Sequence, residues 1–451
     1  MNLTSADELA DEISKSVDVV IIANSNASFI KNGNWNFLSN LTGLEHLTFM
    51  NNEISNMSEF KSRYVANLDN LDHLTIGRNN LNIFPVEKFT ALTRLVYLSL
   101  ECNQLQTLGK GRWNLPLLET LNLFSNQITS VRATQLHGLV NLRQLNMSKN
   151  RITYFALKVL DSLGMLNFLD LSFNQLLHFS EYNVVHTNLQ TINLRNNMFK
   201  MLDPLAVAGI KVLRFITISE NDIEEPPYTR YEINATSVTN LSFRKNKIEK
   251  LSPLFFDNFP RITSLSLSNN KIRHIANDSF RSVSNLVILS MEFNEIETIP
   301  ENLFQHLQNI SFIYIAHNRI KTLAPGILKS LPKFTEVSLL YNPIVCNCSN
   351  VLLAKWLDGS MMSPKDYPKC QYPESLQNQT LNFAKLSNNC SYHQDITEPT
   401  VLYAPGANVT TQTTHDVSKF TFLFKLTYIA ATLGLTLVCY FVCLLKGRIS
   451  A

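Results

Sequence analysis

The stretch LVYLSLECNQL, residues 95–105, carries the pattern on which the fold depends. Leu98 and Leu100 are two positions apart, so in an extended strand they point to the same face, and Asn103 follows where the strand ends. The stretch ITSLSLSNNKI, residues 262–272, repeats the phrase L-x-x-L-x-L-x-x-N-x-L with isoleucine at its two ends. The phrase therefore predicts a short strand, buried on one face, followed by a turn.

The asparagine of this phrase recurs at intervals of 23 to 27 residues. Its thirteen positions are Asn52, Asn79, Asn103, Asn126, Asn150, Asn174, Asn197, Asn221, Asn246, Asn270, Asn294, Asn318 and Asn342. One repeat has no core of its own, whereas stacked repeats bury a continuous one. The period and the phrase resemble the leucine-rich repeat. The resemblance implies an α/β solenoid, a horseshoe whose parallel strands line the concave side, with thirteen repeats over residues 44–345.

We interpret the asparagine column as structural and not as a row of ligand contacts, because apolar residues flank it at fixed offsets on both sides. A side-chain amide carries donors and acceptors, which suits it to pair the backbone groups of the turn. The residues before the first repeat, 1–43, form an N-terminal flank in which Val20 and Ile22 mark a degenerate repeat.

Four of the seven cysteines lie just beyond the last repeat, at Cys346, Cys348, Cys370 and Cys390. With their C-x-C opening and the Trp356-Leu357 pair that follows, residues 346–390 resemble the cysteine-rich cap of extracellular leucine-rich repeat proteins. The resemblance implies disulfides between Cys346 and Cys370 and between Cys348 and Cys390, whereas spacing alone leaves the connectivity open. A zinc site is the alternative, and the lack of a histidine at ligand spacing argues against it.

Disulfides and N-x-S/T sequons both indicate a secretory route. Ten sequons are predicted glycosylation sites: Asn26, Asn40, Asn56, Asn146, Asn234, Asn240, Asn277, Asn309, Asn378 and Asn408. Residues 1–26 are acidic at their start and lack the pattern of a signal peptide. A chain that starts without a signal peptide would be a tail-anchored scaffold with its repeats in the cytosol. The cap and the sequons favour instead a native start further upstream.

An uncharged apolar run at residues 426–445 is long enough to span roughly 30 Å of bilayer. We predict a transmembrane helix over residues 420–445, after a polar stalk at 391–419 and before a cytosolic tail at 446–451. The basic Lys446 and Arg448 mark the cytosolic side. We therefore expect a single-pass type I protein of the plasma membrane with extracellular repeats, which signals through a partner. A glycosylphosphatidylinositol signal starting near Asn408 is the alternative.

Solvent positions of the strands are found by counting back from each asparagine. Near the cap they hold six apolar or aromatic residues, Ile288, Phe293, Phe312, Tyr314, Leu340 and Tyr341. Exposed clusters of this kind mark protein interfaces, so we predict that they bind a partner. The alternative is that these side chains pack on each other or on the cap.

Other residues on the same face form smaller groups. They are the aromatic residues Phe168, Phe173 and Phe215, the basic residues Arg244, Lys245, Lys247 and Lys271, and Cys102. The basic group is either an anionic-glycan site or ordinary solvated charge, and the second is favoured. Glycans at Asn146 and Asn240 are expected to block the middle of this face.

No catalytic motif occurs in the chain, so we expect no enzyme activity, no cofactor and no metal site. His46 and His73 occupy equivalent positions in adjacent repeats, but without a third ligand they are interpreted as surface residues. A net charge of +3 is too small to indicate a nucleic-acid partner.

Together these features predict a cell-surface protein that binds a protein partner, as an adhesion protein, receptor or co-receptor, with a homo- or heterodimer left open. The array also resembles Toll-type ectodomains and insect leucine-rich immune proteins. An innate-immune sensor or decoy receptor is therefore the alternative.

Overall fold

The computed structural model describes residues 17–25, 27–109, 111–179, 188–224, 237–332, 335–360, 363–387 and 390. All of them fall within the unit Met1–Ser391. The predicted stalk, transmembrane helix and tail, at 391–419, 420–445 and 446–451, lie outside the described residues, as do the sequon asparagines Asn26, Asn234 and Asn408. Within the described ranges, no helix combines the length and apolarity that crossing a bilayer requires.

The alternating apolar residues of each repeat form one short strand, and the strands pair in parallel. In the described part of the chain, fourteen strands make a single sheet. Equivalent residues face each other across it, as Leu98, Leu121 and Leu145 do in three successive strands. The strands are β1 (Val19–Ala23), β2 (His46–Met50), β3 (His73–Gly77), β4 (Tyr97–Ser99), β5 (Thr120–Asn122), β7 (Gln144–Asn146), β9 (Phe168–Asp170), β10 (Thr191–Asn193), β11 (Phe215–Thr217), β12 (Asn240–Ser242), β14 (Ser264–Ser266), β16 (Ile288–Ser290), β17 (Phe312–Tyr314) and β18 (Glu336–Ser338).

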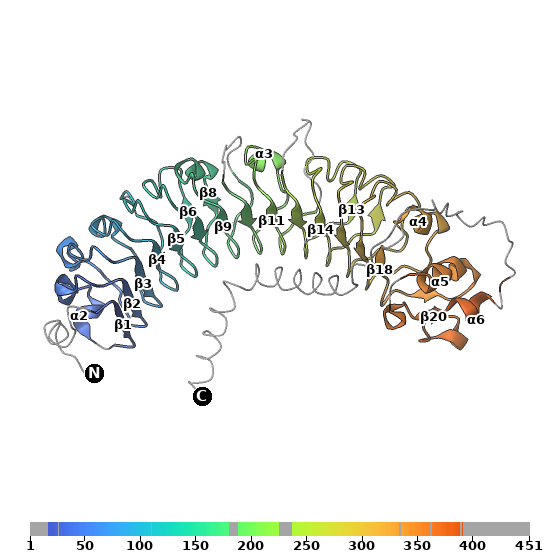
Figure 1. Ribbon diagram of the computed structural model, residues 1–451, viewed down its shortest axis with the longest axis horizontal. Helices are drawn as coiled ribbons and strands as arrows, with labels where there is room; N and C mark the ends of the chain where they lie inside the picture. The colour runs from blue at the N-terminus through green and yellow to red at the C-terminus, as the bar shows by residue number, and fades with distance from the viewer. Residues whose placement is uncertain are drawn as a thin grey trace, which may run out of the picture. The chain divides into compact units, whose positions relative to one another are not determined.

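The core lies between this sheet and the second halves of the repeats. Inward strand residues such as Leu98 are fully buried, and so are outer residues such as Phe280. Figure 1 shows the strands side by side along the inner edge of the array and the connecting segments along its outer edge. The predicted parallel sheet and solenoid are confirmed.

Each ladder asparagine is buried and joins its own repeat to the preceding one. For example, the Nδ2 of Asn126 donates to the carbonyl oxygens of Leu123, at 3.1 Å, and of Leu100 in the preceding repeat, at 3.0 Å. Its Oδ1 accepts the backbone N–H of Leu105 at 3.0 Å. Buried backbone groups need such partners, so the structural interpretation of the asparagine column is confirmed.

The residue before each ladder asparagine has a left-handed backbone conformation. Its φ lies between 53° and 58° in all thirteen repeats, and none of these residues is glycine. This bend ends the strand and turns the chain toward the outer edge. Its N–H remains paired, as in Cys102, which donates to the carbonyl of Phe124 at 2.8 Å. We call these thirteen positions the turn column.

Short elements complete the outer edge and the end of the array. Among the residues that the structure describes, three small two-stranded sheets pair β6 (Ser130–Val131) with β8 (Tyr154–Phe155), β13 (Lys250–Leu251) with β15 (His274–Ile275), and β19 (Ile344–Val345) with β20 (Cys370–Tyr372). The α-helices are α2 (Ser28–Lys31), α3 (Pro204–Val207), α4 (Pro325–Ser330), α5 (Val351–Asp358) and α6 (Phe383–Ser387). The 3-10 helices are η1 (Asn36–Asn40), η2 (Ser62–Tyr64), η3 (Val86–Lys88), η4 (Leu157–Ser162), η5 (Cys348–Asn350), η6 (Pro364–Asp366) and η7 (Glu374–Leu376).

A disulfide-bonded cap follows the last repeat. Its disulfides join Cys346 to Cys370 and Cys348 to Cys390, the pairs that the resemblance implies. Helix α5 buries Leu353 and Leu357. Asn350 extends the ladder into the cap, because its amide donates to the carbonyls of Lys321 and Val345 and accepts the N–H of Leu323.

Candidate partner-binding surface

The six predicted binding residues lie on the last three strands and on the turns that follow them. Ile288 on β16 is in register with Phe312 on β17, which in turn faces Glu336 on β18. Phe312 and Tyr314 are half-buried, and their rings lie parallel with centroids 6.3 Å apart. Leu340 is also half-buried. These side chains thus form the floor of the surface near the cap.

Phe293 and Tyr341 belong to the turn column and are the exposed part of this surface. Phe293 is 48% exposed and Tyr341 is 72% exposed. The ring of His317 lies between them, with centroids 4.1 Å from Phe293 and 4.2 Å from Tyr341 and interplanar angles of 11° and 17°. We call these three residues the aromatic stack. Stacked rings present a large and rigid apolar area to a partner at low entropic cost.

Sequence reasoning missed His317 as a member of the stack. A signal was present, because His317 precedes the ladder asparagine Asn318 just as Phe293 precedes Asn294. The shared left-handed conformation directs successive side chains of the turn column along one line. Residues one repeat apart in this column are therefore neighbours.

Charged groups lie on the same repeats as the aromatic residues. Glu295 forms ion pairs with two arginines. Its Oε2 lies 2.7 Å from Nη2 of Arg319 and 3.1 Å from Nη2 of Arg273. Burial raises the pKa of the Tyr314 hydroxyl, and the carboxylates of Glu336 and Glu292 raise it further. Tyr314 therefore stays a neutral hydrogen-bond donor at physiological pH. An apolar centre with charged groups at its rim is the usual anatomy of a protein interface.

Two of the four residues in the predicted basic group pair with carboxylates, which the sequence pattern did not reveal. Lys245 lies 2.8 Å from Glu220, and Lys247 lies 2.7 Å from Asp222. Arg195 also pairs with Glu220, through its Nε at 3.0 Å. These contacts support the solvated-charge interpretation of the group and weaken the case for an anionic glycan site.

Glu220 is the best-paired carboxylate of this region. Partial burial opposes its ionisation, but hydrogen bonds from Arg195 and Lys245 outweigh that effect and lower the pKa of Glu220 to about 2. Phe173, in the preceding part of the turn column, lies against Lys149 and Arg195 in cation–π contacts of 5.8 and 5.5 Å. The middle of the face is thus a network of mixed charge.

A family model supplies the identity of the repeats. The leucine rich repeat model matches residues 69–128, 116–176, 236–296 and 284–344. The repeats of these segments are leucine-rich repeats. No curated protein sequence matches the chain.

Solved leucine-rich repeat structures resemble the array. A chain of the mouse RP105/MD-1 complex matches with a TM-score of 0.60 and 19% identity, over 81% of this chain and 57% of that one. The APL1 leucine-rich repeat domain matches with a TM-score of 0.57 and 20% identity, over 74% and 82% of the two chains. A chain of the glycosylated Toll–Spatzle complex of Drosophila matches with a TM-score of 0.56 and 18% identity, over 81% and 60%. At these identities the matches show a shared fold. The chain spans less than two thirds of the RP105-complex and Toll-complex chains that it matches.

The described sequon asparagines lie at exposed or half-exposed positions of the leucine-rich repeat array and its cap. The side chains of Asn40, Asn56, Asn277, Asn309 and Asn378 are exposed. Asn146 and Asn240 are half-buried on strands β7 and β12, in the middle of the sheet. Cys102 is half-buried in the turn column and belongs to neither disulfide.

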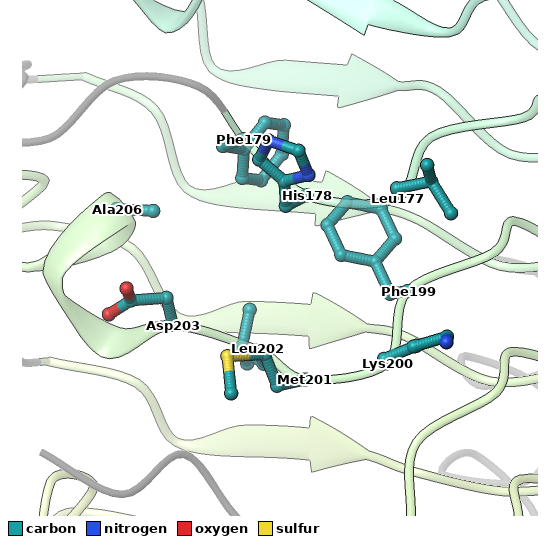
Figure 2. Close-up of a pocket in the computed structure, with 9 residues that line it drawn as sticks. All are labelled: Leu177, His178, Phe179, Phe199, Lys200, Met201, Leu202, Asp203 and Ala206. Atoms are coloured by element: carbon teal, nitrogen blue, oxygen red, sulfur yellow. The ribbon is translucent and has the colours of Figure 1, made fainter.

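An open hollow lies on the leucine-rich repeat segments that follow β9 and β10. Figure 2 shows its lining residues, Leu177, His178, Phe179, Phe199, Lys200, Met201, Leu202, Asp203 and Ala206. Its surface is mainly apolar. The Asp203 carboxylate accepts the N–H of Leu205 and caps α3, so it already has a structural role. Residues 180–187, which continue the chain from Phe179, lie outside the described residues, and we assign no function to the hollow.

Proposed function

We propose that this chain is a cell-surface recognition protein that binds a protein partner through the sheet face of its leucine-rich repeats, in an adhesion, receptor or co-receptor role. The observation that carries the proposal is the aromatic stack of Phe293, His317 and Tyr341. Two of its members are about half exposed or more, at the end of the sheet beside the cap. A few residues carry most of the binding energy at protein interfaces, and tyrosine is one of the residue types enriched among them.

Leucine-rich repeat structures with protein partners support this proposal. Two of the similar structures are complexes, one of RP105 with MD-1 and one of Toll with Spatzle. A solenoid leaves its exposed strand positions free to vary while its buried positions hold the stack together. A surface specialised for one partner therefore arises without any change of fold.

The proposed partner site is tested by charge substitution. We expect Phe293→Asp and Tyr341→Asp each to weaken partner binding at least tenfold, because each buries a carboxylate in an apolar interface. Tyr154→Asp is the matched control, since Tyr154 is 41% exposed on the outer strand β8. Binding is measured with the purified protein against arrayed cell-surface proteins. Unchanged affinity in both stack variants would reject this site.

The same screen separates adhesion or co-receptor binding from the innate-immune alternative. Microbial surface components are included beside the cell-surface proteins. Saturable binding to a cell-surface protein supports the proposal. Saturable binding to a microbial component alone replaces it with the sensor or decoy role.

We propose further that the array is extracellular and anchored in the plasma membrane through residues 420–445. The two cap disulfides and the exposed sequon asparagines support an oxidising, glycosylating compartment. Treatment of the expressed protein with a peptide N-glycosidase is expected to increase its gel mobility. An unchanged mobility contradicts the extracellular topology and favours the cytosolic scaffold.

A further inference from the structure

Two histidines and a carboxylate meet on the sheet face at the N-terminal end of the array. His46 begins β2 and is in register with His73, which begins β3. The two imidazole rings stack with centroids 4.4 Å apart and an interplanar angle of 20°. The Asp72 carboxylate supplies the third group, which sequence analysis did not find. Its Oδ1 lies 2.6 Å from His73 Nδ1 and 3.8 Å from His46 Nε2.

The chemistry of this group is that of a metal site. One donor atom from each residue lies within 4.8 Å of the other two. Imidazole nitrogen and carboxylate oxygen are common ligands of Zn²⁺, at bond lengths of about 2.0–2.2 Å. Two ligands of a tetrahedral ion at such bond lengths lie roughly 3.4 Å apart. The Asp72 Oδ1 distances of 2.6 and 3.8 Å to the two imidazole nitrogens fall on either side of that spacing, so rotation of the side chains is needed to seat an ion.

The backbone holds the three residues in place. Leu47 and Leu74, which follow the two histidines, are buried in the core. The N–H of Asp72 donates to the carbonyl of Glu45 at 3.0 Å, which ties the residue before β3 to the residue before β2. The donors therefore belong to a pre-organised part of the sheet, as a metal site requires.

The surroundings leave one side of the group open. The ring of Tyr97 stacks on His73 at 5.4 Å and 24°, so it covers the side toward β4. All three candidate ligands are half-exposed, with 38–43% of each side chain accessible. A simple hydrogen bond between Asp72 and His73 accounts for those two residues, but it leaves His46 Nε2 beyond hydrogen-bond distance of the carboxylate.

We propose that His46, Asp72 and His73 bind a divalent first-row transition-metal ion of the Zn²⁺ class. Three protein ligands leave a fourth coordination position for water or for an exogenous donor, as in open zinc sites. The aromatic stack follows strands β16 to β18, and β16 lies nine positions beyond β3 in the order of the sheet. It is therefore independent of the proposed partner site.

The test uses the purified full chain without a polyhistidine tag. Co²⁺ is titrated and its visible absorption recorded, and Zn²⁺ binding is measured by calorimetry and by competition with Co²⁺. We expect one saturable equivalent with the absorption of a four-coordinate ion. His46→Gln, His73→Gln and Asp72→Asn should each weaken binding at least tenfold. His306→Gln is the matched control, because His306 is exposed outside this group, and should leave binding unchanged.

Circular dichroism of each variant checks that the fold is retained, which is expected for substitutions of half-exposed side chains. The proposal is overturned if the unsubstituted protein shows no saturable Co²⁺ or Zn²⁺ binding. It is also overturned if the His46 and His73 variants bind as tightly as the unsubstituted protein. Neither result depends on whether a protein partner is found.

Discussion

Removing adjacent ladder asparagines should destabilise the array by more than the sum of the single changes. The Nδ2 of Asn174 donates to the carbonyls of Met147, at 3.1 Å, and of Leu171, at 3.0 Å. Its Oδ1 accepts the N–H of Ile152 at 2.9 Å. The two carbonyls each have a second donor, because Asn150 also donates to Met147 and Asn197 also donates to Leu171. In Asn174→Ala the carbonyls therefore keep one side-chain donor each, whereas the buried N–H of Ile152 loses its side-chain acceptor.

The magnitudes follow from counting these groups. One buried polar group left without a partner costs about 1–3 kcal/mol, so Asn174→Ala should lower the free energy of unfolding by about 2 kcal/mol. In Asn150→Ala/Asn174→Ala the carbonyl of Met147 loses both donors. The double variant should therefore lose about 1–3 kcal/mol beyond the sum of the two single variants.

The distant pair Asn174→Ala/Asn270→Ala is the control. Asn270 donates to the carbonyls of Phe243, Leu267 and Ser268, none of which Asn174 contacts. The effects of these two substitutions on the free energy of unfolding should add within about 0.5 kcal/mol. Urea unfolding followed by circular dichroism measures the five variants and the unsubstituted protein, and hydrogen exchange at the Ile152 amide reports the local effect. If the adjacent pair is as additive as the distant pair, the shared-carbonyl argument is wrong.

Two further predictions concern pH and the cap. Because the pKa of Glu220 is lowered from 4.5 to about 2, its contacts with Arg195 and Lys245 stabilise the fold above pH 4.5, and this contribution is lost as the pH falls toward 2. The melting-temperature difference between the unsubstituted protein and Glu220→Gln should be constant from pH 5 to 7 and shrink below pH 4.5; a constant difference down to pH 2 would contradict this. Replacing both Cys346 and Cys370 by Ala opens a loop with a sequence separation of 24 residues and should cost roughly 3 kcal/mol. Thermal unfolding measures it, and an unchanged midpoint would show that the disulfide contributes nothing to stability.

The solenoid was predictable from the sequence because each repeat contacts its neighbours, and the neighbours carry the same pattern. Leu98, Leu100 and Asn103 specify a strand, its buried face and its end, and the neighbouring repeats carry the same information. Stacking identical units then leaves little choice of topology. The buried role of the asparagine follows for the same reason.

The candidate binding surface was only partly predictable. Counting back from the asparagines placed Phe293 and Tyr341 on the surface, and their exposure agrees with that placement. Their partner His317 was missed, because the stacking depends on the direction in which a left-handed residue holds its side chain. Phe312 and Tyr314 were placed on the same face, but both side chains are only partly exposed.

The sequence by itself determined the repeat, the buried positions and the residues available on the sheet face, since these depend on spacing within about 24 residues. Only the tertiary structure decided which side chains from different repeats meet. It brought Asp72 against two stacked histidines, placed His317 between two aromatic rings and paired Lys245 with Glu220. The physical reason is that a parallel register sets neighbouring strands about 4.8 Å apart. At that distance side-chain direction determines which groups touch, and the repeat pattern does not specify direction.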